Sequence, residues 1–212
     1  MSLEIEIKLR IQDLRSLRAT LRRLRACPPG HGRLRRVHEM NVLFDTPHKD
    51  LARQGQLLRI RTESLWAPGV RSHSHESPRR VLLTFKSRAS QSPRARHVVR
   101  RETELEVASA AALTQILESL GFKAWFRYEK YRTTYTLPPS VRWAKNLLIE
   151  LDETPIGTFV EIEGPPAAID RAARLLGFSS RDYLTATYLQ LYLDDCRRRR
   201  ARPGHMLFPK SI

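Results

Sequence analysis

Cysteine is nearly absent from this sequence, in which Cys27 and Cys196 are the only two among 212 residues. Two cysteines are too few for a disulfide framework, and neither lies in a metal-ligand or redox spacing. Long apolar runs are also missing, since no stretch approaches the roughly 20 residues that cross a bilayer. No apolar segment typical of a signal peptide precedes the first charged residues. We therefore expect a cytoplasmic protein without a membrane span.

Acidic residues are fewer than basic residues. The chain has 22 Asp and Glu against 38 Lys and Arg, a formal net charge of +16 at pH 7. Such an excess attracts polyanions such as polyphosphate, anionic nucleotides or nucleic acid. The length suits one sizeable core, and no internal repeat or composition break divides it. We expect one domain over residues 1–196 and a disordered basic tail over residues 197–212.

The sequence is rich in strict alternation between apolar and charged residues. Between Leu3 and Leu9 the apolar residues alternate with Glu4, Glu6 and Lys8, which is the period of a β-strand. Further strands are expected at residues 34–44, 57–62, 81–86, 97–107, 125–137, 146–152 and 158–163. Helices with apolar stripes are expected after Asp13, Ser109 and Pro165 and over residues 182–194. Short links between most strands favour an antiparallel sheet, with long polar loops at 63–80 and 87–96.

One face of each expected strand carries the charges. The acids are Glu4, Glu6, Glu102, Glu104, Glu150, Asp152, Glu161 and Glu163, and the bases are Lys8, Arg59, Arg61, Lys86, Arg100, Lys130 and Arg132. Two arrangements fit: an open sheet with its charged face in water, or a closed barrel with a charged lumen beneath helices. Because an unpaired buried ion is costly, a charged lumen requires balanced ions or a charged ligand. Carboxylates suit a hard divalent cation, and Lys and Arg suit phosphate oxygens.

Seven short motifs resemble, in order, those of the CYTH superfamily, the triphosphate tunnel metalloenzymes. They are Glu4-x-Glu6-x-Lys8, Phe44-Asp45-Thr46-Pro47, Leu58-Arg59-Ile60-Arg61, Thr84-Phe85-Lys86, Arg100-x-Glu102-x-Glu104, Lys130-Tyr131-Arg132 and Phe159-Val160-Glu161-Ile162-Glu163. The resemblance implies an α+β fold, in which helices jacket an eight-stranded antiparallel β tunnel, a closed barrel with a charged lumen. It also implies binding of a triphosphate together with one or two divalent metal ions.

The resemblance assigns roles to the charged residues. It makes Glu4, Glu6, Glu161 and Glu163 ligands of Mg²⁺ or Mn²⁺, with Glu102, Glu104 and Asp152 as additional ligands or water-positioning groups. Lys8, Arg59, Arg61, Lys86, Arg100, Lys130 and Arg132 would bind the phosphate oxygens. Lys8, Arg59 and Glu104 are the expected catalytic residues, because phosphoryl transfer depends on positioning and charge neutralisation.

Several activities remain open at this point. Family members include inorganic triphosphatases, thiamine triphosphatases and class IV adenylyl cyclases. The cyclases typically carry a His-Phe pair ahead of the first motif, and here only Met1, Ser2 and Leu3 precede Glu4. We therefore favour hydrolysis of inorganic triphosphate, ATP or thiamine triphosphate by a monomer or homodimer, with cyclic AMP synthesis as the alternative. A non-catalytic module that binds polyphosphate or RNA is less favoured, since acids alternate with bases on the same faces.

Some aromatic and histidine side chains have two readings. Trp66, Trp125 and Trp143 are candidates for a platform under an organic group, although packing is the commoner role of Trp. Tyr188 and its neighbours Tyr183 and Tyr192 either pack the last helix or plug a tunnel mouth. His73 and His75 have a spacing compatible with a metal ion, but we expect an exposed loop pair.

Overall fold

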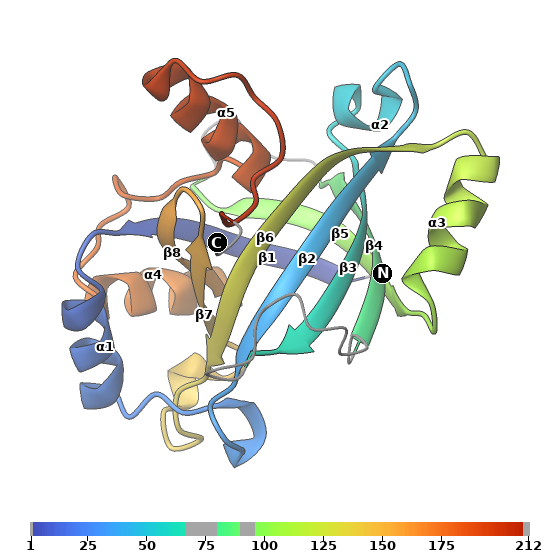
Figure 1. Cartoon of the computed structure of the whole chain (residues 1–212). Helices are drawn as coiled ribbons and strands as arrows, with labels where there is room; N and C mark the ends of the chain where they lie inside the picture. The colour runs from blue at the N-terminus through green and yellow to red at the C-terminus, as the bar shows by residue number, and fades with distance from the viewer. Residues whose placement is uncertain (1, 67–79, 90–95, 210–212) are drawn as a thin grey trace.

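The strands form a closed antiparallel barrel, surrounded by helices (Figure 1). The computed structural model describes residues 2–66, 80–89 and 96–209. The strands are β1 (Ser2–Ile11), β2 (Arg36–Asp45), β3 (Leu57–Leu65), β4 (Arg80–Arg88), β5 (Val98–Glu106), β6 (Lys123–Tyr135), β7 (Leu148–Thr154) and β8 (Gly157–Glu163). The α-helices are α1 (Leu14–Arg23), α2 (Asp50–Arg53), α3 (Ala110–Ser119), α4 (Pro166–Leu175) and α5 (Tyr188–Arg199). The expected α+β fold with an eight-stranded antiparallel barrel is therefore confirmed.

The first strand closes the barrel. Around the barrel the order is β1-β5-β4-β3-β2-β6-β7-β8, and β1 pairs with β5 on one side and with β8 on the other. Glu4 lies opposite Arg100 on β5, and Lys8 lies opposite Glu161 on β8. Since directly opposite residues share a face of the sheet, both pairs point into the lumen.

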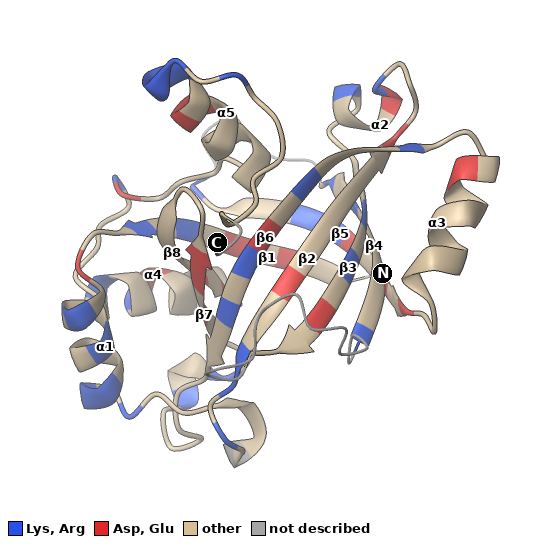
Figure 2. Cartoon of the chain, viewed as in Figure 1, with Lys and Arg blue, Asp and Glu red and all other residues tan. Residues whose placement is uncertain are grey.

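Helices cover the outward apolar faces of the strands. On β1, Ile7 and Leu9 are buried in one cluster with Leu17 of α1 and Ile169 of α4. Asp13 caps α1 by accepting hydrogen bonds from two backbone N–H groups, and the arginines of this helix face outward (Figure 2). On the other side of the barrel, Leu117 of α3 packs against β2, β3 and β4. Helices with one apolar stripe thus provide the expected jacket.

The last helix begins later than predicted. The prediction of a helix over residues 182–194 is wrong at its start, because α5 runs from Tyr188 to Arg199. Thr187 forms a capping box with Gln190, which sets the start of α5. Ahead of it, the backbone N–H of Leu184 donates to the carbonyl of Lys8 at 2.8 Å, so this segment is extended along β1. A local helical pattern is thus overridden by a contact across the fold.

The basic tail is ordered over its described residues. We predicted disorder from Arg197, but α5 continues to Arg199 and the Met206 side chain is only 1% exposed. The backbone of Met206 bonds to that of Arg127 and Glu129 on β6, at the edge that β7 leaves unpaired. An open strand edge pairs readily with extended chain, so the prediction of a disordered tail is wrong for residues 197–209.

The remaining predictions concern loops and membranes. Both long loops are shorter than expected, since Glu63 pairs with Arg80 in the β3–β4 ladder and β4 continues to Arg88. Residues 67–79, including His73 and His75, and residues 90–95 lie outside the described part of the chain. Within the described part, every helix is too short or too polar to span a membrane.

Candidate functional site

A cavity of about 1250 Å³ lies in the barrel lumen. It reaches the end of the barrel that α5 and α2 flank in Figure 1, and its lining includes Gln56 on one side and Thr187 on the other. Every base predicted to bind phosphate lines this cavity, and so does every predicted metal ligand except Asp152. The structure therefore brings together charged residues from strands that are far apart in sequence.

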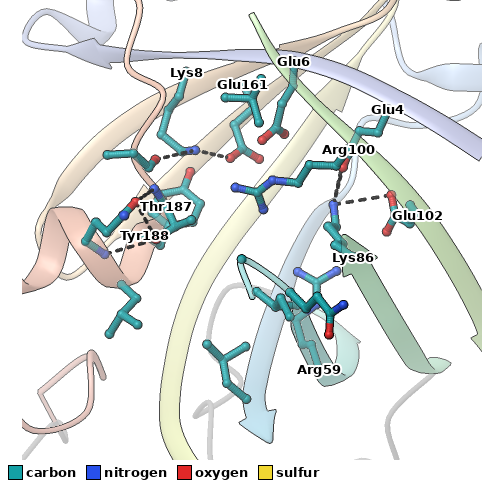
Figure 3. A pocket seen from close by; sticks show the side chains of 18 of the residues that line it. Glu4, Glu6, Lys8, Arg59, Lys86, Arg100, Glu102, Glu161, Thr187 and Tyr188 are labelled. Carbon is teal, nitrogen blue, oxygen red and sulfur yellow. Dashed lines mark hydrogen bonds and ion pairs between the residues drawn. The ribbon is translucent and has the colours of Figure 1, made fainter. Parts of the chain in front are cut away.

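One ionic cluster joins β1, β4 and β5. The Nζ of Lys86 lies 2.6 Å from one carboxylate oxygen of Glu4 and 3.4 Å from Oε2 of Glu102. Figure 3 shows the Arg100 side chain reaching into the cavity beside this cluster. No other described residue forms an ion pair or hydrogen bond with its guanidinium, so this cation is available to an anion in the lumen.

A second cluster joins β1, β6, β7 and β8. Lys8 Nζ lies 2.8 Å from Glu161 Oε1, and Arg132 also contacts Glu161 and Glu150 (Figure 3 shows the Lys8–Glu161 pair). Asp152 is completely buried and accepts hydrogen bonds from Lys130 at 2.9 Å, Arg132 at 2.7 Å and the Tyr188 hydroxyl at 2.6 Å. Its oxygens are thus occupied behind the cavity wall, where they hold three other side chains in place.

A third group joins β2, β3 and β6. Glu39 is 1% exposed and lies 3.5 Å from Lys130 and 3.6 Å from Arg61. Arg59 donates to the Tyr128 hydroxyl at 3.3 Å and to Thr84 at 3.2 Å, and the Thr84 hydroxyl in turn donates to Glu104 at 3.0 Å. Glu104 itself is exposed at the far end of β5.

Buried cations decide the charge state of two carboxylates. Burial alone would raise the pKa of Glu39, but Arg61, Lys130 and Arg132 hold its pKa well below the ordinary value. The pKa of Glu161 is likewise lowered against burial, by Lys8, Lys130 and Arg132. Both groups are therefore ionised at neutral pH and neutralise part of the positive lumen.

Other carboxylates repel one another. Glu6 lies directly opposite Glu163 in the β1–β8 ladder, where two like charges are unfavourable. Burial, together with repulsion from Glu4 and Glu150, raises the pKa of Glu163 to about 7. Burial and Glu161 raise the pKa of Glu6 as well. A cation bound here would relieve this repulsion.

The donor chemistry of these carboxylates fits a divalent cation. Within residues 2–66, 80–89 and 96–209, no three ligating side chains of the His, Cys, Asp or Glu type converge on one point. Oxygen ligands nevertheless suit Mg²⁺ and Mn²⁺, and Glu4, Glu6 and Glu163 all line the lumen. The pKa values of Glu6 and Glu163 are raised, and Glu4 is paired with Lys86. The residues present therefore fit the metal that the resemblance implies.

Sequence reasoning left out several residues of this site. Glu39 and Asn41 share the lumen face of β2 but belong to none of the seven motifs, and Tyr128 reads as an ordinary aromatic strand residue. For Tyr128 the strand alternation was a usable signal, because Tyr128, Lys130 and Arg132 lie on the same face of β6. The buried interior position of Glu39 becomes evident only from its cross-strand neighbours Glu63 and Lys130.

Of the three tryptophans considered as a platform, only Trp125 lines the described cavity. Trp125 lines the cavity, and the Nζ of Lys49 lies 3.8 Å above its ring. Trp66 packs against Tyr131, and Trp143 lies under Arg171 beside the cluster of α1 and α4. Tyr188 packs α5 against Phe159, as the packing interpretation predicts, and it also contacts Lys8 in the lumen wall.

Comparisons with known proteins agree with this geometry. The CYTH domain profile matches residues 2–188, whereas no curated protein matches the sequence. A candidate adenylate cyclase from Vibrio parahaemolyticus has a TM-score of 0.66 at 17% identity, over 90% of this chain and 97% of that one. An adenylyl cyclase candidate from Hippeastrum with a dominant triphosphatase activity has a TM-score of 0.53 at 24% identity, over 94% and 97%. A chain of the Schizosaccharomyces pombe Mediator head module has a TM-score of 0.52 at 10% identity, over 83% and 92%. These structural likenesses show the fold alone.

Proposed function

Because the chain belongs to the CYTH domain family, we propose that it is a metal-dependent triphosphatase that hydrolyses a small triphosphate inside the barrel. The observation that carries this proposal is the set of bases that line one cavity from β1, β3, β4, β5 and β6, namely Lys8, Arg59, Arg61, Lys86, Arg100, Lys130 and Arg132. Inorganic triphosphate, ATP and thiamine triphosphate share the charged group that this set suits. The Hippeastrum protein with a dominant triphosphatase activity supports the same choice.

The position of the bases favours a small ligand over a polymer. They point into a closed barrel, whereas proteins that bind single-stranded nucleic acid offer a groove or an open sheet along which the backbone can run. A triphosphate chain is short enough to enter the lumen from the end that α5 and α2 flank. We therefore rank the polyphosphate- or RNA-binding alternative below an enzyme for the lumen.

The residues have separable tasks in the proposed reaction. Arg100, Lys86 and Lys8 bind phosphate oxygens and balance the charge that moves between them during phosphoryl transfer. Asp152 and Glu39 position Lys130, Arg132 and Arg61 through the contacts described above. Glu4, Glu6 and Glu163 would hold the divalent cation, which when bound supplies further neutralisation of the phosphate oxygens.

Water activation falls to the remaining carboxylates. Glu104 is connected to Arg59 through the Thr84 hydroxyl, so a water bound to Glu104 would lie on the side of the lumen where Arg59 holds phosphate. A carboxylate can accept the proton of an attacking water and orient it. We therefore keep Glu104 and Arg59 as catalytic candidates together with Lys8.

Cyclic AMP synthesis is the second candidate function. It is favoured by the Vibrio parahaemolyticus relative, which is a candidate adenylate cyclase, and by Trp125 at the cavity edge, where a base could stack. A cyclase brings a ribose hydroxyl to the α-phosphate and releases pyrophosphate, whereas a triphosphatase releases phosphate. Product identity therefore separates the two activities.

The decisive experiment is incubation with inorganic triphosphate, ATP and thiamine triphosphate, each with Mg²⁺ or Mn²⁺, followed by chromatography of the products. We expect metal-dependent release of phosphate from at least one substrate. Lys8→Ala should lower kcat/KM at least about 100-fold, because a charge-neutralising group in a desolvated site is lost. The exposed Lys145→Ala is the matched control, and circular dichroism checks the fold. Full activity of Lys8→Ala, or activity that survives chelation of the metal, would contradict the proposal.

A further inference from the structure

The excess positive charge of the chain lies outside the barrel cavity. Among the described residues, nine Lys and Arg side chains line the cavity, and so do nine Asp and Glu side chains. The cavity lining is therefore balanced, although the whole chain has 38 basic and 22 acidic residues. Binding of a triphosphate in the lumen does not account for this excess, so the excess needs another explanation.

One stretch of the chain, residues 14–38, contains eight arginines and no acidic residue. Seven of the eight are exposed and form no ion pair with a carboxylate in the described part of the chain. Arg15, Arg18 and Arg22 follow one another at spacings of three and four residues, so they share one stripe of α1. Like charges at these spacings destabilise a helix, so the stability of α1 does not explain their presence.

The connection after α1 brings further arginines to the same end of the barrel. Cys27 and Thr136 exchange backbone hydrogen bonds at 2.9 and 2.7 Å, and Arg36 lies opposite Thr133 on β6. The chain therefore leaves the end of β6 and returns to it within three residues, about 10 Å along the strand. The exposed arginines of this connection are Arg25, Arg33 and Arg35.

Arg18 of α1 lies beside the same end of β6. Burial raises the pKa of Tyr135, the last residue of β6, and the nearby charge of Arg18 opposes this rise. Glu153, the other charge that acts on Tyr135, is paired with Arg36 at 2.6 Å. Figure 2 shows basic residues along α1 and along the connection at the bottom of the view, with no acidic residue between them. We call this surface the basic face, and it consists of Arg15, Arg18, Arg22, Arg25, Arg33 and Arg35.

The residue types of the basic face favour the phosphate backbone of a duplex. Its cations are all arginines, whose planar guanidinium donates two parallel hydrogen bonds to a phosphate. Arg15 and Arg22 are about 10 Å apart along the axis of α1, a length over which a duplex presents about six phosphate charges. Residues 14–38 contain no Phe, Trp or Tyr, on which proteins that bind single strands stack the bases.

A membrane surface fits the basic face less well. Helices that bind membranes insert their apolar face, but Leu17 and Leu21 of α1 are buried in the protein core. Leu34 is the one large apolar side chain exposed in the described part of residues 14–38. Even a myristoyl chain alone gives only marginal membrane binding, and a leucine buries far less. Nucleic acid is therefore the favoured partner.

We propose that the basic face binds the phosphate backbone of a double-stranded nucleic acid without sequence preference. The stripe on α1 and the arginines of the following connection both contact phosphates. The basic face lies outside the lumen, so this binding is independent of the proposed triphosphatase activity.

Fluorescence anisotropy of a labelled DNA duplex of about 24 base pairs, between about 50 and 200 mM NaCl, measures the binding. If the six arginines neutralise six phosphates, the logarithm of the binding constant falls with the logarithm of the salt concentration with a slope of about −5. The triple variant Arg15→Gln, Arg18→Gln and Arg22→Gln should raise the Kd at least about tenfold at the lowest salt and reduce the slope to about −3. Because Gln is a good helix former, α1 should persist, which circular dichroism and thermal melting check.

A matched control removes three exposed bases elsewhere, by Arg101→Gln on β5 together with Lys123→Gln and Arg127→Gln on β6. It changes the net charge by the same amount, and it should keep the wild-type slope and a Kd within about threefold, since the phosphate contacts remain. Lys8→Ala, which alters the lumen, should also keep the wild-type affinity for the duplex.

Several outcomes would overturn the proposal. They are a wild-type Kd weaker than about 100 µM at the lowest salt, equal losses in the triple variant and the control, or tighter binding of a single strand than of the duplex. Vesicles of phosphatidylcholine with about 30% phosphatidylserine test the membrane. Vesicle binding that the triple variant loses, with unchanged duplex binding, would assign the basic face to a membrane instead. Duplex binding without phosphate release would end the triphosphatase proposal alone, and phosphate release without duplex binding would end this one alone.

Discussion

At the scale of single residues, the lumen contains some charges that are ion-paired and others that face a charge of the same sign. Lys86 is shared between Glu4 and Glu102, and Glu161 between Lys8 and Arg132. Glu6 and Glu163, by contrast, face each other across the β1–β8 ladder. A site that must take up both a cation and a polyanion needs such an imbalance, because fully paired ions would have to be separated before any ligand could bind.

The imbalance predicts a pH-dependent stability. The pKa of Glu163 is about 7 in the folded protein, above its ordinary value of 4.5, so the folded state binds more protons between these pH values. Stability contributed by this group should therefore fall as pH rises from about 4.5 to 7. In Glu163→Gln this fall should be smaller by roughly 1 kcal/mol, a value reduced for solvent screening of a partly exposed group.

Urea unfolding of the metal-free protein at pH 5 and pH 8 measures this difference. Glu118→Gln on the exposed surface of α3 is the control and should follow the wild type. An identical pH dependence in Glu163→Gln and wild type would show that Glu163 is not under strain from its neighbours.

At the scale of secondary-structure elements, α5 connects packing to the site. Its capping box at Thr187 and Gln190 sets where the helix begins, and the first helical residue, Tyr188, reaches Asp152 and Lys8. Further along α5, Leu191 is buried in one cluster with Phe126 and Phe159 of the barrel end. A shift in the start of α5 would therefore move a hydroxyl that holds the lumen wall.

Removing the cap should affect both stability and activity. Thr187→Ala leaves the backbone N–H of Gln190 without its acceptor, which should cost about 1 kcal/mol of folding free energy. We also expect a lower kcat for whichever triphosphate is hydrolysed, because Tyr188 loses its fixed position. Thermal unfolding and steady-state kinetics test this, with Thr187→Ser, which keeps the hydroxyl, as the matched control. Equal melting temperatures for the two variants would refute the role of the cap.

At the scale of the whole molecule, the charge and the closed barrel act together. The net charge of +16 draws polyanions toward the protein, and the closed wall directs a set of its cations into one cavity. Arginines also lie on the outer face of α1, where they contribute to attraction but not to the site (Figure 2). Only a ligand that enters the lumen meets both the bases and the carboxylates.

Binding in the lumen should stabilise the barrel as a unit. Inorganic triphosphate at about 100 times its Kd should add about 2.7 kcal/mol, since it binds only the folded state. For a chain of this size that corresponds to a rise in Tm of several degrees. Differential scanning fluorimetry measures this shift in Tm. The shift should be smaller in 0.5 M NaCl, because the electrostatic screening length there is about threefold shorter than in dilute buffer. Inorganic phosphate is the control and should give a smaller shift. A shift equal for both anions, or one insensitive to salt, would contradict binding among converging cations.

Which residues share a face of a strand follows from the local sequence, because alternation is a local property of period two. Glu4, Glu6 and Lys8 on β1, or Tyr128, Lys130 and Arg132 on β6, were assigned to their faces without any knowledge of their neighbours. The CYTH motifs then favoured closure over an open sheet. Which charges meet, by contrast, depends on how the strands are arranged in the barrel. The pairing of Glu6 with Glu163 and the burial of Asp152 behind Tyr188 depend on register between strands distant in sequence. Register and the docking of Met206 on β6 arise from contacts across the fold, and no local pattern of residues encodes them.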